Sequence, residues 1–187
     1  MFSLIRIRES IRIPPHLFSE DRSRVLEDEV NRQFSNRVVE GHGQCIILYD
    51  WLSIGEDRIL YGDGATQTLV EFRMVVFRPM AGDVLLARIR AVDATGIFLS
   101  LDFFDDIFID KKDLQHPSTF EVEDNAWIWK YEENELYLYE FDYIWFKVLD
   151  VFFSQPGDKD AAEGRKSPMH IRGSIAGDGL GGASWWA

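Results

Sequence analysis

Only one stretch of this sequence has the spacing of an amphipathic helix, and it lies among segments with the patterns of strands. Leu26, Val30 and Phe34 recur at every fourth position, and Val25 widens the apolar stripe. This spacing predicts a helix of about four turns over residues 21–34. A chain with a single helix must bury that helix against a sheet, which restricts the fold to an α+β or a mainly β architecture.

The residues before the helix predict a strand, a break and an N-cap, in that order. Residues 2–13 alternate loosely between apolar and polar side chains, which predicts a strand with one buried face. Pro14 and Pro15 end this strand. Ser19 is the expected N-cap of the helix, with Glu20 and Asp21 in the first turn, where the helix dipole favours carboxylates.

Strand-like segments punctuated by glycine follow the helix. They cover residues 37–40, 44–51, 58–61 and 68–80, with turns predicted at 41–43, 55–57 and 62–64. The turns GHG and GDG lack the spacing of a phosphate-binding loop and a following helix, so they favour hairpins. We therefore predict an N-terminal α+β domain, residues 1–80, in which a sheet holds one main helix.

The second half of the chain, residues 81–187, has no helical segment of useful length. Five short strands are predicted at residues 83–92, 96–101, 105–110, 125–132 and 143–153. Five short strands after a glycine-marked start favour an all-β Greek-key barrel of the OB-fold type. Residues 154–168 lack apolar anchors and predict a mobile loop, residues 170–175 are compatible with a last strand, and the tail has the sequence GLGGASWW.

Charge is distributed unevenly between the two halves. The formal net charge is −12, and residues 81–187 carry 20 acidic against 10 basic side chains. A nucleic-acid-binding protein normally has a basic footprint, since neutralising phosphates supplies most of the non-specific affinity. Any contact with RNA must therefore be local. No apolar run approaches the roughly 18 residues that a membrane helix needs, so no membrane partner is expected.

Residues that could carry catalysis or bind metal are sparse and poorly spaced. Cys45 is the only cysteine, which excludes an internal disulfide and a multi-cysteine zinc site and favours a reducing compartment. The four histidines are His16, His42, His116 and His170, and none has zinc-ligand spacing. The acidic pairs Asp105-Asp106 and Glu132-Glu133 favour solvated or turn positions, because neighbouring strand residues point to opposite faces. We expect no catalytic residues, no metal and no cofactor.

Aromatic and basic residues of the predicted barrel are the candidates for binding. Strands two and three of an OB barrel form its nucleic-acid face, and here they carry Phe98, Phe103, Phe104 and Phe108. These rings either fill the barrel or stack on unpaired bases. Lys111 and Lys112 at the end of the third strand are candidate phosphate contacts, or a plain solvated pair. Trp185 and Trp186 dock either on this chain or on a partner.

Several segments resemble a known family. The opening MFSLIRIRESIRIPPHLF resembles the larger stalk subunit of eukaryotic RNA polymerases, as do FSNRVVEGHGQCIILYD, GDGATQTLVEFRMVVFRPMAGDV and GIFLSLDFFDDIFI. The ending GSIAGDGLGGASWW resembles the polymerase III version within the family shared with the polymerase II and archaeal subunits. The resemblance covers essentially the whole chain, and its segments are specific in combination.

The resemblance implies an N-terminal polymerase-docking domain, an OB barrel and a nuclear, non-catalytic role in DNA-directed RNA polymerase III. It implies a heterodimer with a smaller helical stalk subunit, contact with the large core subunits and initiation factors, and support of initiation at tRNA, 5S rRNA and other small RNA genes. The implied core-contacting tip comprises Gly55, Glu56, Gly62, Asp63 and Gly64. The implied contacts with nascent RNA are Arg88, Phe98, Lys111 and Lys112.

The sequence also departs from the family pattern. Residues 109–114, IDKKDL, lack a proline that relatives usually have, and residues 133–148 are acidic where relatives more often carry arginine. A free-standing single-stranded RNA-binding OB protein is the alternative hypothesis, and the net charge of −12 counts against it. An enzyme using Cys45 or the acidic pairs has no support in the spacing.

Overall fold

The computed structural model describes residues 1–154 and 168–186 of this chain. The chain divides into two compact units, Met1–Arg78 and Pro79–Ala187, which we call the N-terminal and the C-terminal unit. Most of the predicted mobile loop, residues 155–167, lies outside the described residues. No helix in the described ranges is long and apolar enough to span a membrane.

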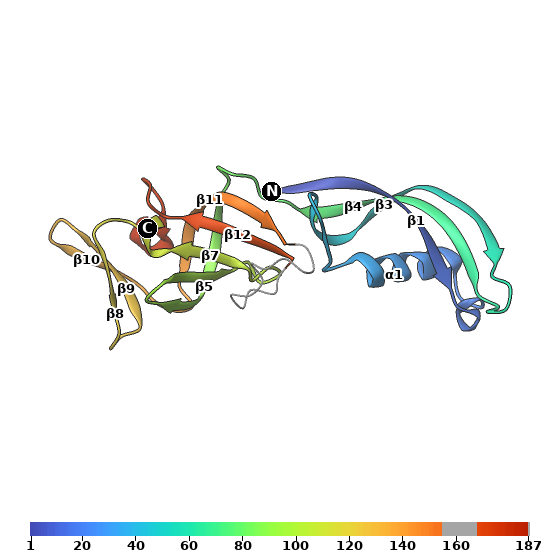
Figure 1. Cartoon of the computed structure of the whole chain (residues 1–187), viewed down its shortest axis with the longest axis horizontal. Helices are drawn as coiled ribbons and strands as arrows, with labels where there is room; N and C mark the ends of the chain where they lie inside the picture. The colour runs from blue at the N-terminus through green and yellow to red at the C-terminus, as the bar shows by residue number, and fades with distance from the viewer. Residues whose placement is uncertain (155–167, 187) are drawn as a thin grey trace. The chain divides into compact units, whose positions relative to one another are not determined.

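The N-terminal unit is an antiparallel sheet of order β1-β4-β3-β2 with one helix on one face (Figure 1). Its elements are β1 (Phe2–Ile13), α1 (Arg22–Phe34), β2 (Val38–Val39), β3 (Gly43–Ile59) and β4 (Thr66–Phe77). The single predicted helix and the sheet that holds it are thus confirmed. The chain belongs to the α+β class in this half.

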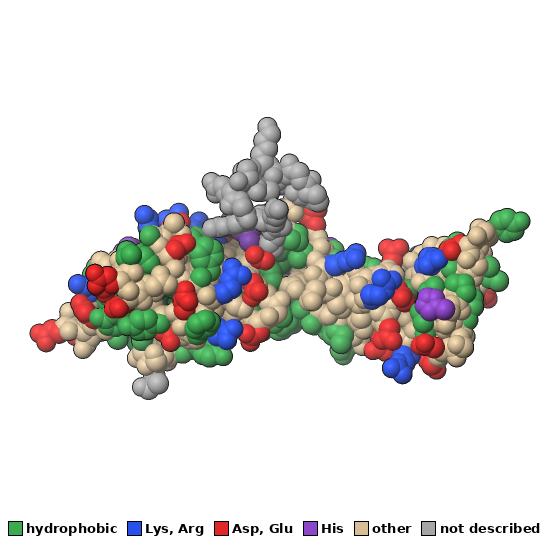
Figure 2. Space-filling view, turned by 90° about the horizontal axis from the view of Figure 1, so that it is seen from below, with side chains coloured by type: hydrophobic (Ala, Val, Ile, Leu, Met, Phe, Trp, Pro, Cys, Tyr) green, Lys and Arg blue, Asp and Glu red, His purple; other side chains and the backbone are tan. Residues whose placement is uncertain are grey.

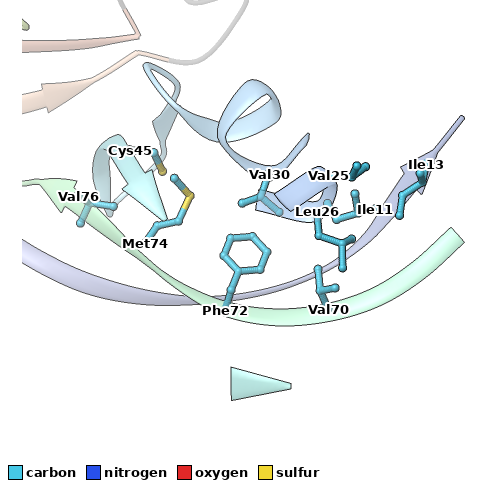
Figure 3. Packing of buried hydrophobic residues seen from close by; sticks show 10 residues of the cluster. All are labelled: Ile11, Ile13, Val25, Leu26, Val30, Cys45, Val70, Phe72, Met74 and Val76. Atoms are coloured by element: carbon cyan, nitrogen blue, oxygen red, sulfur yellow. The ribbon is translucent and has the colours of Figure 1, made fainter. Parts of the chain in front are cut away.

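The apolar stripe of α1 forms the core of this unit together with one face of the sheet. Leu26 and Val30 are fully buried, and they pack with Phe72 and Val70 of β4 and with Ile11 of β1 (Figure 3). Phe34 is partly buried against the same cluster. Burying one aliphatic side chain of this size stabilises a fold by about 1.5–3 kcal/mol. The stripe predicted from the spacing therefore faces the sheet.

The N-cap of α1 differs from the prediction. Asp21, not Ser19, holds the cap position, where its carboxylate accepts a hydrogen bond of 3.0 Å from the backbone N–H of Arg24. The helix accordingly begins at Arg22. Residues 19 and 21 are both of a type that caps helices, and the local sequence does not distinguish them.

The turn predicted at residues 55–57 is also wrong, because β3 runs unbroken through it. The pairing passes from Ile54↔Val70 to Asp57↔Thr68, which leaves one extra residue on β3 as a β-bulge. A Cβ on Gly55 would lie 2.9 Å from the carbonyl oxygen of Leu69. Glycine therefore marks a close approach of two strands here, not a reversal of the chain.

The C-terminal unit contains a closed five-stranded barrel, and the predicted OB-type fold is confirmed. The strands are β5 (Val84–Asp93), β6 (Gly96–Ser100), β7 (Ile107–Asp110), β11 (Tyr143–Phe153) and β12 (Met169–Ser174). They pair in the cyclic order β5-β6-β7-β12-β11, and β11 returns to β5. Only the pair β7–β12 is parallel. Alternate residues of each strand fill the interior, among them Ile97, Leu99, Ile107 and Ile109.

The predicted membership of the barrel needs one correction. The segment at residues 125–132 forms β9 (Ala126–Tyr131), which lies outside the barrel in a three-stranded sheet of order β10-β9-β8 (Figure 1). Its neighbours are β8 (Ser118–Glu121) and β10 (Asn134–Leu138), which the sequence analysis did not anticipate. The fifth barrel strand is β12 instead. Local alternation predicts a strand but not the sheet to which it belongs.

Candidate docking and RNA-contact surfaces

The implied core-contacting tip is the end of the N-terminal unit at which β3 turns into β4. Gly62 and Asp63 lie in this turn, and Gly64 follows it. The Arg12 side chain of β1 binds the Asp63 carboxylate through two hydrogen bonds of 2.8 and 2.9 Å. Gly55 and Glu56 lie in the bulge of β3, not in a loop. The structure thus places the five predicted residues along one hairpin.

A second arginine ties the bulge of β3 to the helix. Arg22, the first residue of α1, donates to the carbonyl oxygen of Gly55 at 2.9 Å and to the Asp57 carboxylate at 2.8 Å. Thr68 of β4 also donates to Asp57. The hydrogen bond from Arg22 lowers the pKa of Asp57, because it stabilises the ionised carboxylate. The hairpin is therefore braced from two sides.

Apolar side chains project from the braced hairpin, and the sequence analysis missed them. Ile59 is 78% exposed and Tyr61 is fully exposed. Figure 2 shows a hydrophobic side chain projecting at the right-hand end of the molecule, the end where the β3–β4 turn lies in Figure 1. We call Ile59 and Tyr61 the apolar tip. Large apolar side chains held outward on a braced hairpin are typical of an interaction site.

The face of the N-terminal sheet opposite α1 is a second surface without a helix. Leu4, Val75 and Ile47 lie in register across β1, β4 and β3, and Leu4 and Ile47 are exposed. The next row on this face is charged, since Arg6 pairs with Arg73 in register and Arg73 donates to Asp50. We call Leu4, Val75 and Ile47 the sheet-face row. An apolar row beside charged side chains has the pattern of an interface, with an apolar centre and a polar rim.

Two phenylalanines form the centre of the predicted RNA face of the barrel. Phe98 of β6 and Phe108 of β7 are paired in register, and their ring centroids lie 4.8 Å apart. Their strand neighbours Ile97 and Ile109 point into the barrel, so both rings lie on its outer wall, half-buried. The other two candidate rings differ: Phe104 is buried, and neither it nor Phe103 belongs to a strand.

The predicted lysines lie at the end of this outer wall. Lys111 follows β7 directly, and its backbone N–H donates to the carbonyl oxygen of Thr95 in the β5–β6 turn at 3.0 Å. The Lys112 ammonium lies 3.6 Å from the Asp110 carboxylate. At this distance the Asp110 carboxylate, whose pKa is lowered by a hydrogen bond from the backbone N–H of Lys112, offsets the charge of Lys112. Lys111 makes no ion pair within the described ranges, so its charge is not offset as that of Lys112 is.

Arg88 lies opposite Ser100 of β6, whereas the residue opposite Phe98 is Ala91. Arg88 is exposed on β5, where it pairs in register with Tyr143 of β11, and its guanidinium lies 5.8 Å from the ring centroid of Phe141. The structure places a different arginine beside the phenylalanines: Arg172 of β12 is in register with Phe108. Two hydrogen bonds, of 2.6 and 3.0 Å, bind Arg172 to Asp113 and raise its pKa. Only strand pairing could have revealed Arg172.

The two terminal tryptophans occupy different environments. Trp185 is half-buried, its ring centroid lies 5.4 Å from that of Trp129 in β9, and its indole N–H donates to the carbonyl oxygen of Tyr137 at 3.4 Å. Trp186 is 52% exposed. The tail also adds a short strand, β13 (Gly181–Gly182), to β11. The structure therefore seats Trp185 on this chain and leaves much of Trp186 in solvent.

The remaining chemical candidates lie in ordinary structural positions. Cys45 is fully buried, and burial raises its pKa, which disfavours the reactive thiolate. Asp105 accepts a hydrogen bond of 2.5 Å from the Ser100 hydroxyl. His170 stacks on Phe152 with 4.9 Å between ring centroids. Among the residues that the structure describes, no three His, Cys, Asp or Glu side chains gather to hold a metal ion.

Two family models match the chain, one in each half. Residues 8–64 match the SHS2 domain found in the N terminus of Rpb7p/Rpc25p/MJ0397. Residues 83–186, more than half of the chain, match the model described as RNA polymerase III subunit Rpc25.

Individual proteins show the same similarity over their full length. DNA-directed RNA polymerase III subunit RPC8 of Bos taurus is 34% identical over 100% of this chain and 98% of its own length. The subunits of the same name in Schizosaccharomyces pombe and Saccharomyces cerevisiae are 35% and 33% identical, over 100% of both chains in each case. Archaeal Rpo7 of Saccharolobus solfataricus is 30% identical over 54% of this chain. With its SHS2 unit, its OB-type barrel and this full-length similarity, the chain belongs to the RPC8/Rpc25 family of RNA polymerase III subunits.

Proposed function

We propose that this protein is a non-catalytic, nuclear subunit of DNA-directed RNA polymerase III. It forms the stalk with a smaller helical subunit and supports initiation at tRNA, 5S rRNA and other small RNA genes. The observation that carries this proposal is the similarity over the entire length to proteins named RNA polymerase III subunit RPC8. A subunit of this kind acts through its surfaces, which it offers to larger neighbours.

Two surfaces of the N-terminal unit support the proposed assembly. The apolar tip is suited to insertion into the polymerase core, because Arg12 and Arg22 brace the hairpin that carries it. The sheet-face row is suited to the helical partner, because its apolar side chains lie in register on the face that α1 leaves open. Covering either surface removes apolar area from water, at roughly 25 cal/mol for each Å².

Co-purification tests the proposal directly. The full chain, tagged and expressed in its native cell, is recovered at low salt, and the proteins bound to it are identified by mass spectrometry. The proposal predicts the two large polymerase III subunits and one small helical protein in stoichiometric amounts. Recovery of the chain as a monomer, with neither class of partner, would refute it.

We further propose that the outer wall of the barrel contacts nascent single-stranded RNA. The paired, half-buried rings of Phe98 and Phe108 support this, since aromatic rings on a protein surface stack on unpaired bases for about 1–3 kcal/mol each. Lys111 supports it as a phosphate contact at the same end of the wall. Acidic neighbours offset Lys112 and Arg172, so the contact is local and weak on its own.

Fluorescence anisotropy with a short single-stranded RNA tests this contact on the chain in complex with its partner. We expect Phe98→Ala to weaken binding about tenfold through lost stacking, and Lys111→Ala to weaken it less and to reduce its salt dependence. Trp145→Ala is the control, because this exposed ring lies on β11 and is paired in register with β5, not with β6 or β7. Equal affinities of all three variants and the wild type would exclude the contact.

A further inference from the structure

The C-terminal unit contains an aromatic groove that the proposed function does not use. It has a volume of about 630 Å³ and lies between the tail and the sheet formed by β9 and β10. Four aromatic residues line it: Trp129 and Tyr131 from β9, and Trp185 and Trp186 from the tail. This volume falls within the range of roughly 300–1,000 Å³ that is usual for binding pockets.

The groove is rigidly built on its inner side. The ring centroid of Trp129 lies 5.4 Å from that of Trp185 and 5.0 Å from that of Tyr131. The tail is fastened beneath it, because the side-chain amide of Gln115 donates to the carbonyl oxygen of Leu180 at 3.0 Å. The outer rings are accessible: Tyr131 is 50% and Trp186 is 52% exposed. Aromatic rings that are held in place and partly exposed are pre-organised for a ligand, which lowers the entropic cost of binding.

The aromatic ring faces are the main feature of the groove, because the indole N–H groups of both tail tryptophans already have hydrogen-bond partners. The indole N–H of Trp186 donates to the carbonyl oxygen of Leu180 at 3.3 Å, and that of Trp185 donates to Tyr137. Both tail donors are therefore engaged within the chain, whereas the buried indole nitrogen of Trp129, which also lines the groove, has no hydrogen-bond partner among the described residues. An aromatic face carries the negative end of the ring quadrupole, so it attracts a cation placed over it.

Charge in and around the groove points to the same kind of ligand. None of its lining residues is basic, and two are acidic, Glu135 and Asp178. The Glu135 carboxylate forms an ion pair with Lys130, whose ammonium lies 3.5 Å away. It also accepts a hydrogen bond of 3.1 Å from the Tyr137 hydroxyl. Asp178 makes no ion pair within the described ranges and is exposed. Residues 118–142, which form the adjoining sheet, contain eight acidic side chains and one lysine.

Figure 2 shows acidic side chains at the left-hand end of the molecule, the end at which this sheet lies in Figure 1. A negative surface of this kind repels phosphate groups and raises the local concentration of cations. We infer that the aromatic groove binds a basic segment of a partner protein, placing a lysine or arginine side chain against the rings of Trp186 and Tyr131 and near Asp178. Charge complementarity selects this occupant over RNA and over an acidic peptide.

Anisotropy titration of the full chain with three labelled probes tests the inference. The probes are a peptide of alternating glycine, lysine and arginine, the same peptide with glutamate at each basic position, and a single-stranded RNA of similar length. We expect saturable binding of the basic peptide alone, weakened as salt is raised. Trp186→Ala and Asp178→Asn should each weaken that binding, Trp186→Ala by about tenfold, or about 1.4 kcal/mol, because the variant loses a cation–π contact.

Matched variants separate the groove from general charge and aromatic content. Tyr139→Ala removes an exposed ring of the same region outside the groove, and Asp124→Asn removes one negative charge outside it. Both should bind the basic peptide as the wild type does. If Trp186→Ala does not fold, Asp178→Asn and Asp178→Lys provide the comparison. Unchanged binding in every groove variant, equal loss in the controls, or groove-dependent binding of RNA or of the acidic peptide would overturn the inference.

Discussion

Glycine at position 181 decides how the tail docks. A Cβ on Gly181 would lie 2.3 Å from the Trp185 ring, and the residue has a φ of +105°. The indole therefore lies directly against the backbone of β13, which only a residue without a side chain permits. This contact fixes Trp185 against Trp129 and so shapes one wall of the aromatic groove.

Gly181→Ala is predicted to displace Trp185. The variant should lose about 1–3 kcal/mol of unfolding free energy through overpacking, added to the strain of a positive φ, and its tryptophan emission should shift to longer wavelength. Urea unfolding followed by tryptophan fluorescence measures both effects.

Gly179→Ala provides the matched control for this substitution. Gly179 also has a positive φ, of +74°, but a Cβ there would meet no atom within 4 Å. This variant should show the backbone strain without the displaced ring. Equal losses of stability and equal spectra in the two variants would mean that Trp185 does not rest on Gly181.

The sequence alone left the docking of the tryptophans open for a physical reason. A large apolar ring can be buried against the same chain or against another protein, and the local composition does not distinguish these two cases. The partner of Trp185 is Trp129, in a strand far along the chain. Likewise Phe98 and Phe108 were both candidates from the sequence, but only strand pairing showed that they lie opposite each other and that Arg172 lies opposite Phe108.

Among the elements, α1 shows which features are encoded locally. Its apolar stripe follows from the spacing of Leu26, Val30 and Phe34, and the structure buries that stripe as predicted. The first residue of α1 cannot be predicted from the local sequence in the same way, because Ser19 and Asp21 are both suitable N-cap residues. Asp21 takes the position and receives the hydrogen bond from Arg24.

Alanine substitutions at the two positions test this assignment. Asp21→Ala should lower the unfolding free energy by about 1 kcal/mol, because the first turn of α1 loses a hydrogen-bond acceptor. Ser19→Ala should leave it within about 0.5 kcal/mol of the wild type, as for a substitution at an ordinary exposed position. Urea denaturation of both variants provides the measurement. If Ser19→Ala lowered the unfolding free energy more than Asp21→Ala, residue 19 and not residue 21 would be the N-cap.

The strands mark the limit of local prediction. Most of their segments were found, but β3 was divided in two because Gly55 looks like a turn residue, and it is instead a site of close strand approach. Residues 125–132 were wrongly assigned to the barrel in place of β12, because closure depends on the parallel pairing of β7 with β12, which are far apart in sequence. Alternation identifies a strand, whereas its partner is decided by tertiary packing.

For the whole molecule, family membership and surface chemistry lead to the same view of how it works. The chain belongs to a family of polymerase III subunits, and its noteworthy features are surfaces: the apolar tip, the sheet-face row, the paired phenylalanines and the aromatic groove. The central claim is that the first two dock different neighbours.

Quantitative mass spectrometry of complexes recovered with tagged variants tests this claim most directly. The double variant Ile59→Ser/Tyr61→Ser should lose the large polymerase subunits and keep the small helical partner, while Ile47→Glu should lose the small partner. Each variant serves as the control for the other, because both replace exposed side chains of the same unit. Wild-type recovery of both classes of partner by both variants would contradict the assignment of these surfaces.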